Sequence, residues 1–443
     1  MPKNIKNKER DAIIQSLKSG VVPRLGLRHI QVGRSQELSS LVKNIENIKD
    51  GGNAFRFVIG EYGSGKTFFL QLVKSIALEK GLVTINADLA PNKRLHASDG
   101  QARTLFSELI NSASTRTKKD GNALDNILER FINSMIEQAK STEKSVSYTI
   151  NQSLLTVKDH VGGYDFATVI EKYWIGYETC DDNLKNCAVR WLKAEYTTKG
   201  EALRDLGVRT YINDAGFYDY LKLFSVLVKL AGYEGLLVCI DEMVNLYKLT
   251  NSTSRKSNYE EILRMLNDSL QGATSNIGFI LGGTPEFLTD THRGLYSYEA
   301  LKSRLAENTF AKQLGITDYN STVLRLSNLS KEELYLLLKN LRYVFAYGDE
   351  QEYLVPDDAL VAFLNHCANK IGDSYFRTPR NTIKEFLNLL SILEQHPDMM
   401  WSDIIEKIDI RKDIEDSALA ENTIKSSNSV ATEFDEDFAT IKI

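Results

Sequence analysis

A glycine-rich turn between a strand-like and a helix-like segment constrains this sequence most strongly. Residues 60–67 read Gly-Glu-Tyr-Gly-Ser-Gly-Lys-Thr, a G-x-x-x-x-G-K-T pattern. The apolar and aromatic run 54–59 before the turn predicts a buried strand, and the periodicity of 67–80 after it predicts a helix. Strand, glycine turn and helix in this order are the context that a phosphate-binding loop requires. A chance glycine turn is the alternative, which both flanking segments disfavour.

Each residue type in this loop has a physical use at a phosphate group. Glycines let backbone N–H groups turn toward the anion, and the helix N-terminus adds partial positive charge. Lys66 would reach the β and γ phosphates, and the Thr67 hydroxyl would be a Mg²⁺ ligand. We therefore expect ATP and Mg²⁺ as cofactors. The expected nucleotide-binding residues of the loop are Gly60, Glu61, Tyr62, Gly63, Ser64, Gly65, Lys66, Thr67 and Phe68.

A second motif is an apolar strand that ends in two acids. The run 236–240 is followed directly by Asp241 and Glu242. At the carboxyl end of a strand, Asp241 suits a metal-holding carboxylate, and Glu242 suits a general base that polarises the attacking water. Both could instead be solvated loop residues, but a phosphate loop in the same chain favours catalysis. A small-molecule kinase has less need of the second acid, so hydrolysis is favoured over phosphotransfer.

Strand and helix patterns divide the chain into several parts. Strand-like runs recur at 82–87, 236–240, 277–281 and 322–326 with helical segments between them, which predicts a parallel sheet covered on both faces. We expect an α/β core at 35–87 and 217–329, interrupted by a large helical insertion at 88–216. The other expected parts are a basic N-terminal arm with an adenine-side segment at 1–34, a C-terminal helical lid domain at 330–410 and an acidic, disordered tail at 411–443.

Composition and charge exclude some classes and leave others open. The chain is 42% hydrophobic and 26% charged, as in ordinary globular proteins, and its longest apolar run is too short to span a membrane. We expect a cytoplasmic protein without a membrane partner. Residues 413–443 carry eight acids against two lysines, so the net charge of −5 belongs to the tail. Residues 1–34 carry eight basic residues against two acids, which keeps DNA open as a partner.

Together these motifs resemble those of AAA+ ATPases. Within this class they resemble the clade of origin-recognition and Cdc6-like proteins. The segment with Val32, Gly33 and Arg34 is similar to the box that flanks the adenine in that clade. Residues 278–284 resemble the sensor-1 strand, in which Thr284 would touch the γ-phosphate or the lytic water; the clade commonly has Asn there. The resemblance implies a P-loop core with a helical lid.

Two arginines gain expected roles from the same resemblance. Arg304 lies in a Leu-Lys-Ser-Arg-Leu box similar to the one that carries the arginine finger, which reaches a neighbouring subunit's nucleotide. A surface salt bridge is its alternative. Arg380 lies in a Tyr-Phe-Arg-Thr-Pro-Arg-Asn segment that resembles the sensor-2 motif, where it would contact the γ-phosphate from the lid. Arg377 is a rival for that role. The resemblance thus implies a homo-oligomer.

A closer resemblance covers nearly the whole chain and points to a biological setting. The segments 60–70, 86–91, 241–247, 282–287 and 377–380 resemble the ATP-binding P-loop proteins of bacterial BREX-type phage-defence loci. This resemblance implies a setting among other defence proteins more than a defined reaction beyond ATP hydrolysis. Our leading hypothesis is an ATP-hydrolysing switch or motor of the AAA+ type that acts on DNA or a DNA-bound complex.

Two other functions stay open beside this one. A nucleotide-loaded scaffold would hydrolyse ATP slowly and recruit defence partners, and a P-loop phosphotransferase would move phosphate to an acceptor. No winged-helix segment follows the expected lid, so DNA would be reached through the basic N-terminal segment, the insertion or a partner protein.

Overall fold

The computed structural model describes residues 5–408, except for the side chain of residue 312. The chain divides into two compact units. The first, here called the α/β unit, comprises Arg34–Glu61 and Lys66–Ser327. The second, the helical unit, comprises Met1–Gly33, Tyr62–Gly65 and Asn328–Ile443. The expected tail 411–443 lies outside the described residues.

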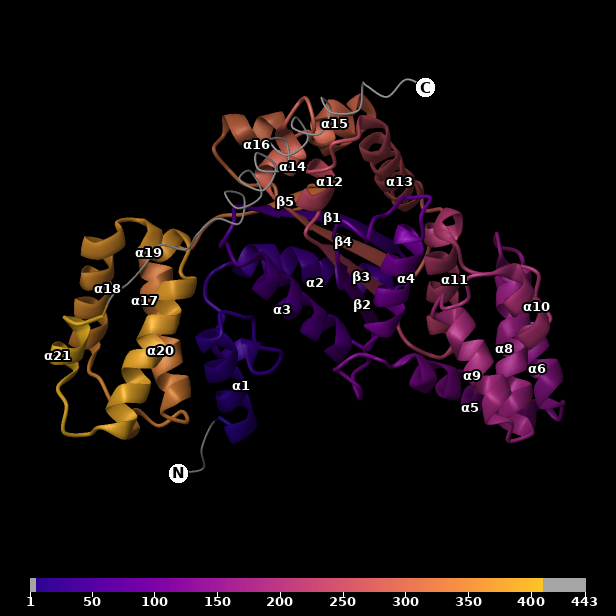
Figure 1. Cartoon of the computed structure of the whole chain (residues 1–443), viewed down its shortest axis with the longest axis horizontal. Coiled ribbons are helices and arrows are strands. Elements are labelled where there is room, and N and C mark those ends of the chain that lie inside the picture. The colour runs from indigo at the N-terminus through magenta and orange to yellow at the C-terminus, as the bar shows by residue number, and fades with distance from the viewer. Residues whose placement is uncertain (1–4, 409–443) are drawn as a thin grey trace, which may run out of the picture. The chain divides into compact units, whose positions relative to one another are not determined.

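The α/β unit is built on a five-stranded sheet in the order β2-β3-β4-β1-β5 (Figure 1). All neighbouring strands pair in parallel, with Phe55 opposite Phe279 and Asp88 opposite Asp241 in the register. The expected α/β class and its parallel sheet are therefore confirmed. The strands are β1 (Asn53–Gly60), β2 (Val83–Asp88), β3 (Leu236–Asp241), β4 (Ile277–Gly283) and β5 (Val323–Leu326).

The sheet is buried on both faces because successive strand residues alternate between two apolar clusters. Ala54 and Val58 of β1 pack on one face with α2 (Ser35–Lys49) and α3 (Lys66–Glu79). Phe55 and Phe57 pack on the opposite face. The helices on that side include α4 (Gln101–Asn111), α11 (Phe217–Leu230) and α13 (Ser252–Leu270).

The long segment between β2 and β3 is helical, in agreement with its periodicity. Its first helix, α4, packs against β2, and residue Ser114 pairs with Thr84 of that strand. The later helices form a helical cluster whose apolar residues, such as Trp191 and Phe166, join the core of the same face (Figure 1). They are α5 (Leu124–Thr142), α6 (Val146–Ser153), α7 (Leu155–Lys158), α8 (Gly163–Glu178), α9 (Asp182–Leu192) and α10 (Lys199–Leu206).

Short helices connect the last strands of the α/β unit. Between β3 and β5 they are α12 (Val244–Tyr247), α14 (Pro285–Thr289), α15 (Glu299–Leu305) and α16 (Thr309–Gln313).

The helical unit contains elements from both ends of the described chain. Its C-terminal helices are α17 (Lys331–Phe345), α18 (Asp357–Ile371), α19 (Ser374–Arg377), α20 (Arg380–Gln395) and α21 (Trp401–Ile405). Ser330 and Glu333 begin α17 with a reciprocal capping box. The basic segment 1–34, expected as an arm, contributes α1 (Asn7–Lys18) and a 3₁₀ turn at Leu27–His29, which pack on this unit. No helix among the described residues is long and apolar enough to cross a membrane.

Candidate functional site

The glycine-rich loop leaves β1 at Gly60 and enters α3 at Lys66. Gly63 and Gly65 have φ angles of 78° and 80°, in the left-handed region that favours glycine. Between them the Ser64 residue is 2% exposed. Alternating left-handed glycines turn successive N–H groups to one side, which is the backbone form of an anion-binding loop.

Lys66 lies over its own loop. Its Nζ donates to the carbonyls of Gly60 (2.8 Å) and Glu61 (2.9 Å). Burial lowers the pKa of Lys66, and the charges of Asp241 and Glu242 oppose that shift. The ammonium group therefore sits at the mouth of the loop with acids nearby, where phosphate oxygens could replace the two carbonyls.

Thr67 and Asp241 meet although 174 positions separate them. The Thr67 hydroxyl donates to Asp241 Oδ2 over 3.2 Å, and the other carboxylate oxygen accepts the Glu242 N–H over 2.9 Å. Asp241 itself is buried. Hydroxyl and carboxylate oxygens are the ligands that Mg²⁺ prefers, and Mg²⁺ commonly takes only one or two protein ligands beside phosphate and water. The pair therefore fits the expected metal. The described residues contain no group of three or more His, Cys, Asp or Glu side chains that could hold a metal ion without phosphate.

Gly282 of β4 makes room for the Asp241 carboxylate. A Cβ at Gly282 would lie 2.2 Å from Asp241 Oδ1 and 2.9 Å from its Cγ. The Met243 N–H also donates to the Gly282 carbonyl over 3.0 Å. Gly282, two positions before the expected sensor residue Thr284, thus makes space for the carboxylate of the expected metal ligand Asp241.

Glu242 follows β3 in a left-handed conformation, with a φ of 57°. Such a conformation is uncommon for a residue with a side chain and turns Glu242 sharply away from the strand direction. Desolvation raises the pKa of Glu242, and the charges of Asp241 and Asp88 raise it further. A carboxylate with a raised pKa is a better proton acceptor, as a general base requires.

Asp88 is a further candidate site residue, which sequence reasoning missed. It ends β2 directly opposite Asp241 of β3, and the next residue, Leu89, donates its N–H to the Asp241 carbonyl over 3.0 Å. Desolvation and then the Asp241 charge raise the pKa of Asp88. A signal for it was present, since an acid directly follows the predicted strand 82–87 just as Asp241 follows 236–240.

The expected sensor residue Thr284 follows β4, which lies between the loop strand β1 and the Asp241 strand β3. The topology therefore brings Thr284 to the same sheet edge as both motifs. Its hydroxyl accepts the Phe287 N–H at 3.5 Å and begins α14 as an N-cap. The hydroxyl hydrogen remains available as a donor.

Arg304 lies in the last turn of α15 and is held within its own chain. Its Nε donates to Asn267 Oδ1 and its Nη1 to the Ala300 carbonyl, each over 2.8 Å. It lines a cavity of about 570 Å³ that Gly60 and Glu61 also line. A cavity of this size is typical of a small-molecule site.

The residues expected on the adenine side lie where the chain passes from the helical unit, which ends at Gly33, to the α/β unit, which begins at Arg34. Gly33 has a φ of 62°, and a Cβ there would lie 1.9 Å from Glu333 Oε1 in the capping box of α17. Arg34, in a left-handed conformation, donates from Nη2 to the Ser327 carbonyl over 3.1 Å. Val32 is half-buried.

Within the helical unit, Arg380 and Arg377 have different partners. Arg380 begins α20, and its Nη1 lies 3.4 Å from the hydroxyl of Tyr62, a phosphate-loop residue. Arg377 instead pairs with Asp373 over 3.8 Å. A Cβ at Gly63 would lie 2.7 Å from Thr378 Cγ2, so the centre of the loop lies directly against the turn before Arg380.

The last of the expected nucleotide-binding residues, Phe68, belongs to the α/β unit. It is half-buried in the first turn of α3.

A comparison with protein families gives one match that covers nearly the whole chain. The family model described as BREX system ATP-binding protein BrxC/D matches residues 5–409. The matched range includes every candidate residue described above. The search of curated proteins found no match.

Proposed function

The chain belongs to the BREX system ATP-binding protein family BrxC/D, and from this premise we propose that it is a Mg²⁺-dependent ATPase. The proposal rests on one observation above the others, the hydrogen bond of 3.2 Å between Thr67 and Asp241. It joins the end of the phosphate loop to the acidic strand, so one Mg²⁺ could bind both side chains. The same strand end supplies Glu242, and the same helix start supplies Lys66.

Each of the candidate site residues has a defined part in the proposed hydrolysis. The loop N–H groups and Lys66 bind the phosphates, and Thr67 and Asp241 would hold Mg²⁺. Bound Mg²⁺ supplies positive charge that neutralises the phosphate oxygens. Glu242 accepts a proton from the attacking water at its carboxylate, because desolvation and neighbouring acids raise its pKa. Thr284 orients that water or the γ-phosphate from the adjacent strand.

We also propose that hydrolysis is of the AAA+ type. The strand order supports this, because β4 with Thr284 lies between β1 and β3. Arg380 supports it by approaching the phosphate-loop residue Tyr62, and so Arg380, not Arg377, is the proposed lid sensor. Arg304 is the proposed finger toward a second subunit. The protein would then act as a homo-oligomeric switch or motor.

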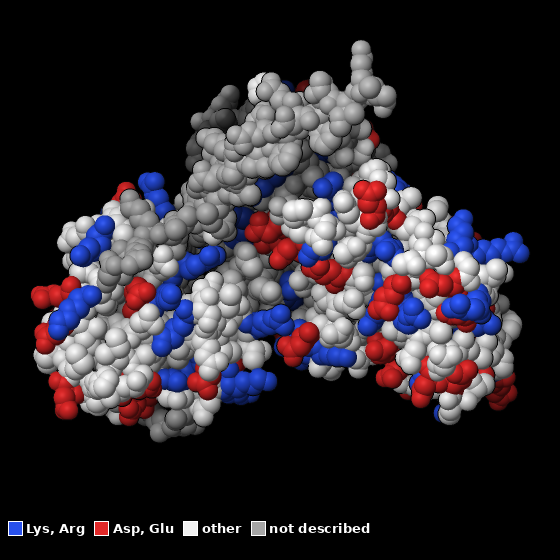
Figure 2. Space-filling model, viewed as in Figure 1, with Lys and Arg blue, Asp and Glu red and all other residues white. Residues whose placement is uncertain are grey.

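The proposed target is a DNA-bound complex of the defence system. Of the basic residues in segment 1–34, Arg10, Lys18, Arg28 and Arg34 take part in contacts within the chain. On the face drawn in Figure 2, basic and acidic side chains of the described residues are interspersed. Such a mixed surface favours a partner protein on DNA over direct binding of bare duplex.

A second candidate, the slowly hydrolysing scaffold, is favoured by the surface of the helical insertion. Val161, just before α8, and Tyr164, in its first turn, are 74% and 70% exposed, and Leu155 nearby in sequence is 50% exposed. Exposed apolar side chains close together in sequence are a candidate surface for another protein. The insertion could therefore recruit defence partners whatever the rate of hydrolysis.

Measurement of the reaction products separates these functions. We expect steady-state release of free phosphate by the wild type, and a fall of kcat by about 10²–10⁴ in Glu242→Gln, the range of general-base catalysis. The assay is run without DNA, with single strands and with duplex. A wild type no faster than Glu242→Gln would support the scaffold. Labelled phosphate on an acceptor would support a phosphotransferase.

A further inference from the structure

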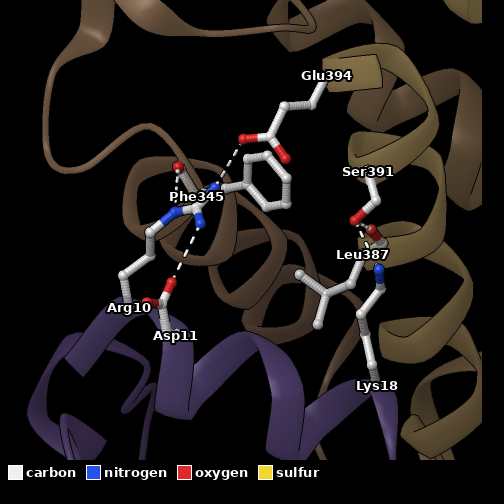
Figure 3. Close-up of polar contacts among 7 residues, drawn as sticks. All are labelled: Arg10, Asp11, Lys18, Phe345, Leu387, Ser391 and Glu394. Atoms are coloured by element: carbon white, nitrogen blue, oxygen red, sulfur yellow. Dashed lines mark hydrogen bonds and ion pairs between the residues drawn. The ribbon is translucent and has the colours of Figure 1, made fainter. Parts of the chain in front are cut away.

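We infer that the N-terminal helix α1 is a structural member of the helical unit and that Arg10 fastens it there. Figure 3 shows Arg10 reaching from α1 toward Phe345 at the end of α17 and Glu394 near the end of α20. The Arg10 side chain is only 11% exposed. A basic residue of the segment expected as a basic N-terminal arm is thus buried among three helices.

The Arg10 guanidinium satisfies several groups at once. Its Nε donates to the Phe345 carbonyl over 3.0 Å, and its Nη2 donates to Glu394 Oε1 over 2.9 Å. The last carbonyls of a helix have no partner within the helix and carry partial negative charge, so a cation at Phe345 is favourable. The guanidinium carbon also lies 4.6 Å from the Phe345 ring centroid and 4.3 Å from that of Tyr347.

Further contacts hold the rest of the N-terminal segment. Lys18, at the other end of α1, donates to Ser391 Oγ over 2.6 Å (Figure 3). Ile13 between these polar contacts is fully buried. The chain then folds back over α1 at Gly26, where a Cβ would lie 2.7 Å from Ile13 Cδ1. An ion pair between Arg28 Nη2 and Glu9 Oε1, 3.1 Å apart, joins the returning segment to α1.

The stability of α17 and α20 should therefore depend on α1. Without Arg10, the buried Phe345 carbonyl loses its donor, and Glu394, whose side chain is 49% exposed, loses its cation. The larger cost falls on the Phe345 carbonyl, because a buried acceptor without a donor stays desolvated. Both ends of the described chain thus belong to one cooperative unit.

One consequence rests on the proposed function. Helix α20 begins at Arg380, the proposed lid sensor, and its last turn is held by Arg10 through Glu394. Arg10 would then be a positioning residue, which acts on the nucleotide site only through α20 and Arg380.

Hydrogen exchange of the full chain tests the structural inference. Arg10→Ala should accelerate amide exchange in α17 and α20 at least about tenfold, the effect of losing one charged hydrogen bond, and leave β1–β5 unchanged. Lys8→Ala, an exposed residue on the same helix, is the matched control and should change neither. Glu394→Gln, a milder variant, should accelerate the same two helices to a smaller extent. Acceleration confined to α1 in these variants would overturn the inference.

ATP hydrolysis tests the positioning role separately. If Arg10 acts through Arg380, the double variant Arg10→Ala/Arg380→Ala should be no slower than Arg380→Ala alone. Multiplied losses would overturn that role. A wild type without ATPase activity would defeat the proposed function, but the exchange result would still decide whether α1 belongs to the helical unit.

Discussion

At the scale of single residues, the site depends on a glycine as much as on its acids. Gly282 has no catalytic group, yet its missing side chain lets the Asp241 carboxylate approach Thr67. A Cβ at this position would overlap Asp241 Oδ1, and the buried carboxylate has little room to withdraw.

Gly282→Ala should therefore weaken Mg²⁺-dependent nucleotide binding. We expect Kd for Mg·ATP to rise at least about tenfold, which equals roughly 1.4 kcal/mol, measured by titration calorimetry. Gly200→Ala is the matched control, because a Cβ at Gly200 in α10 meets no atom within 4 Å. Equal affinities for Gly282→Ala and the wild type would contradict the account of the Asp241 site.

Asp88 should influence the pH dependence of hydrolysis. Glu242 accepts a proton only when ionised, so kcat falls as the pH falls through its pKa. The negative charge of Asp88 raises the pKa of Glu242. Asp88→Asn removes that charge and should move the acidic limb of the kcat profile to lower pH. A limb that stays in place or moves to higher pH would refute this coupling.

At the scale of elements, a buried cation joins the edge of the sheet to its covering helix. Arg56 of β1 is 7% exposed. Its Nε donates to Asn44 Oδ1 over 2.7 Å and its Nη2 to Ser40 Oγ over 3.3 Å, both on α2. Its Nη1 donates to the Ser321 carbonyl just before β5. One side chain thus ties strands β1 and β5 to α2.

Arg56→Met should lower the free energy of unfolding by about 2–4 kcal/mol, because one buried acceptor, on Ser40, and two partly buried acceptors, on Asn44 and Ser321, lose a charged donor. Urea unfolding followed by circular dichroism measures the change. Arg24→Met, at an exposed position of the N-terminal segment, is the control and should change stability little. Equal losses in both variants would mean that Arg56 has no special role.

The sequence predicted the positions of helices and strands better than the contacts between them. Strands such as 54–59 and 236–240 could be predicted because apolar runs between glycine turns and acids leave few alternatives, and the structure has β1 and β3 there. The packing of α1 could not be predicted from the sequence. Eight basic residues in segment 1–34 indicate exposure, and no local pattern shows that Arg10 contacts Phe345, which lies 335 positions later. Gly282 could not be predicted as a steric requirement for the same reason.

At the scale of the whole molecule, the proposed finger determines whether subunits depend on one another. Arg304 is bound to Asn267 and Ala300 of its own chain, and as a finger in trans it would leave these partners on assembly. We expect a mixture of Arg304→Ala and Glu242→Gln proteins to hydrolyse ATP faster than the sum of the two alone. In mixed oligomers an intact Glu242 then meets an intact Arg304.

The mixing experiment has an internal control. In a mixture of Glu242→Gln with Lys66→Ala every subunit keeps Arg304, but no site has both Lys66 and Glu242, so this mixture measures the background from subunit exchange. If the first mixture shows no gain over the sum of its parts, Arg304 does not act across a subunit boundary.

Above all, we propose that Lys66, Thr67, Asp241 and Glu242 form one site that hydrolyses Mg·ATP. A single-turnover assay with enzyme in excess over labelled ATP tests it most directly, because it measures the chemical step at equal nucleotide occupancy. We expect Glu242→Gln to bind ATP as tightly as the wild type but to release phosphate about 10²–10⁴ times more slowly. Equal rates of phosphate release in the two proteins would contradict it.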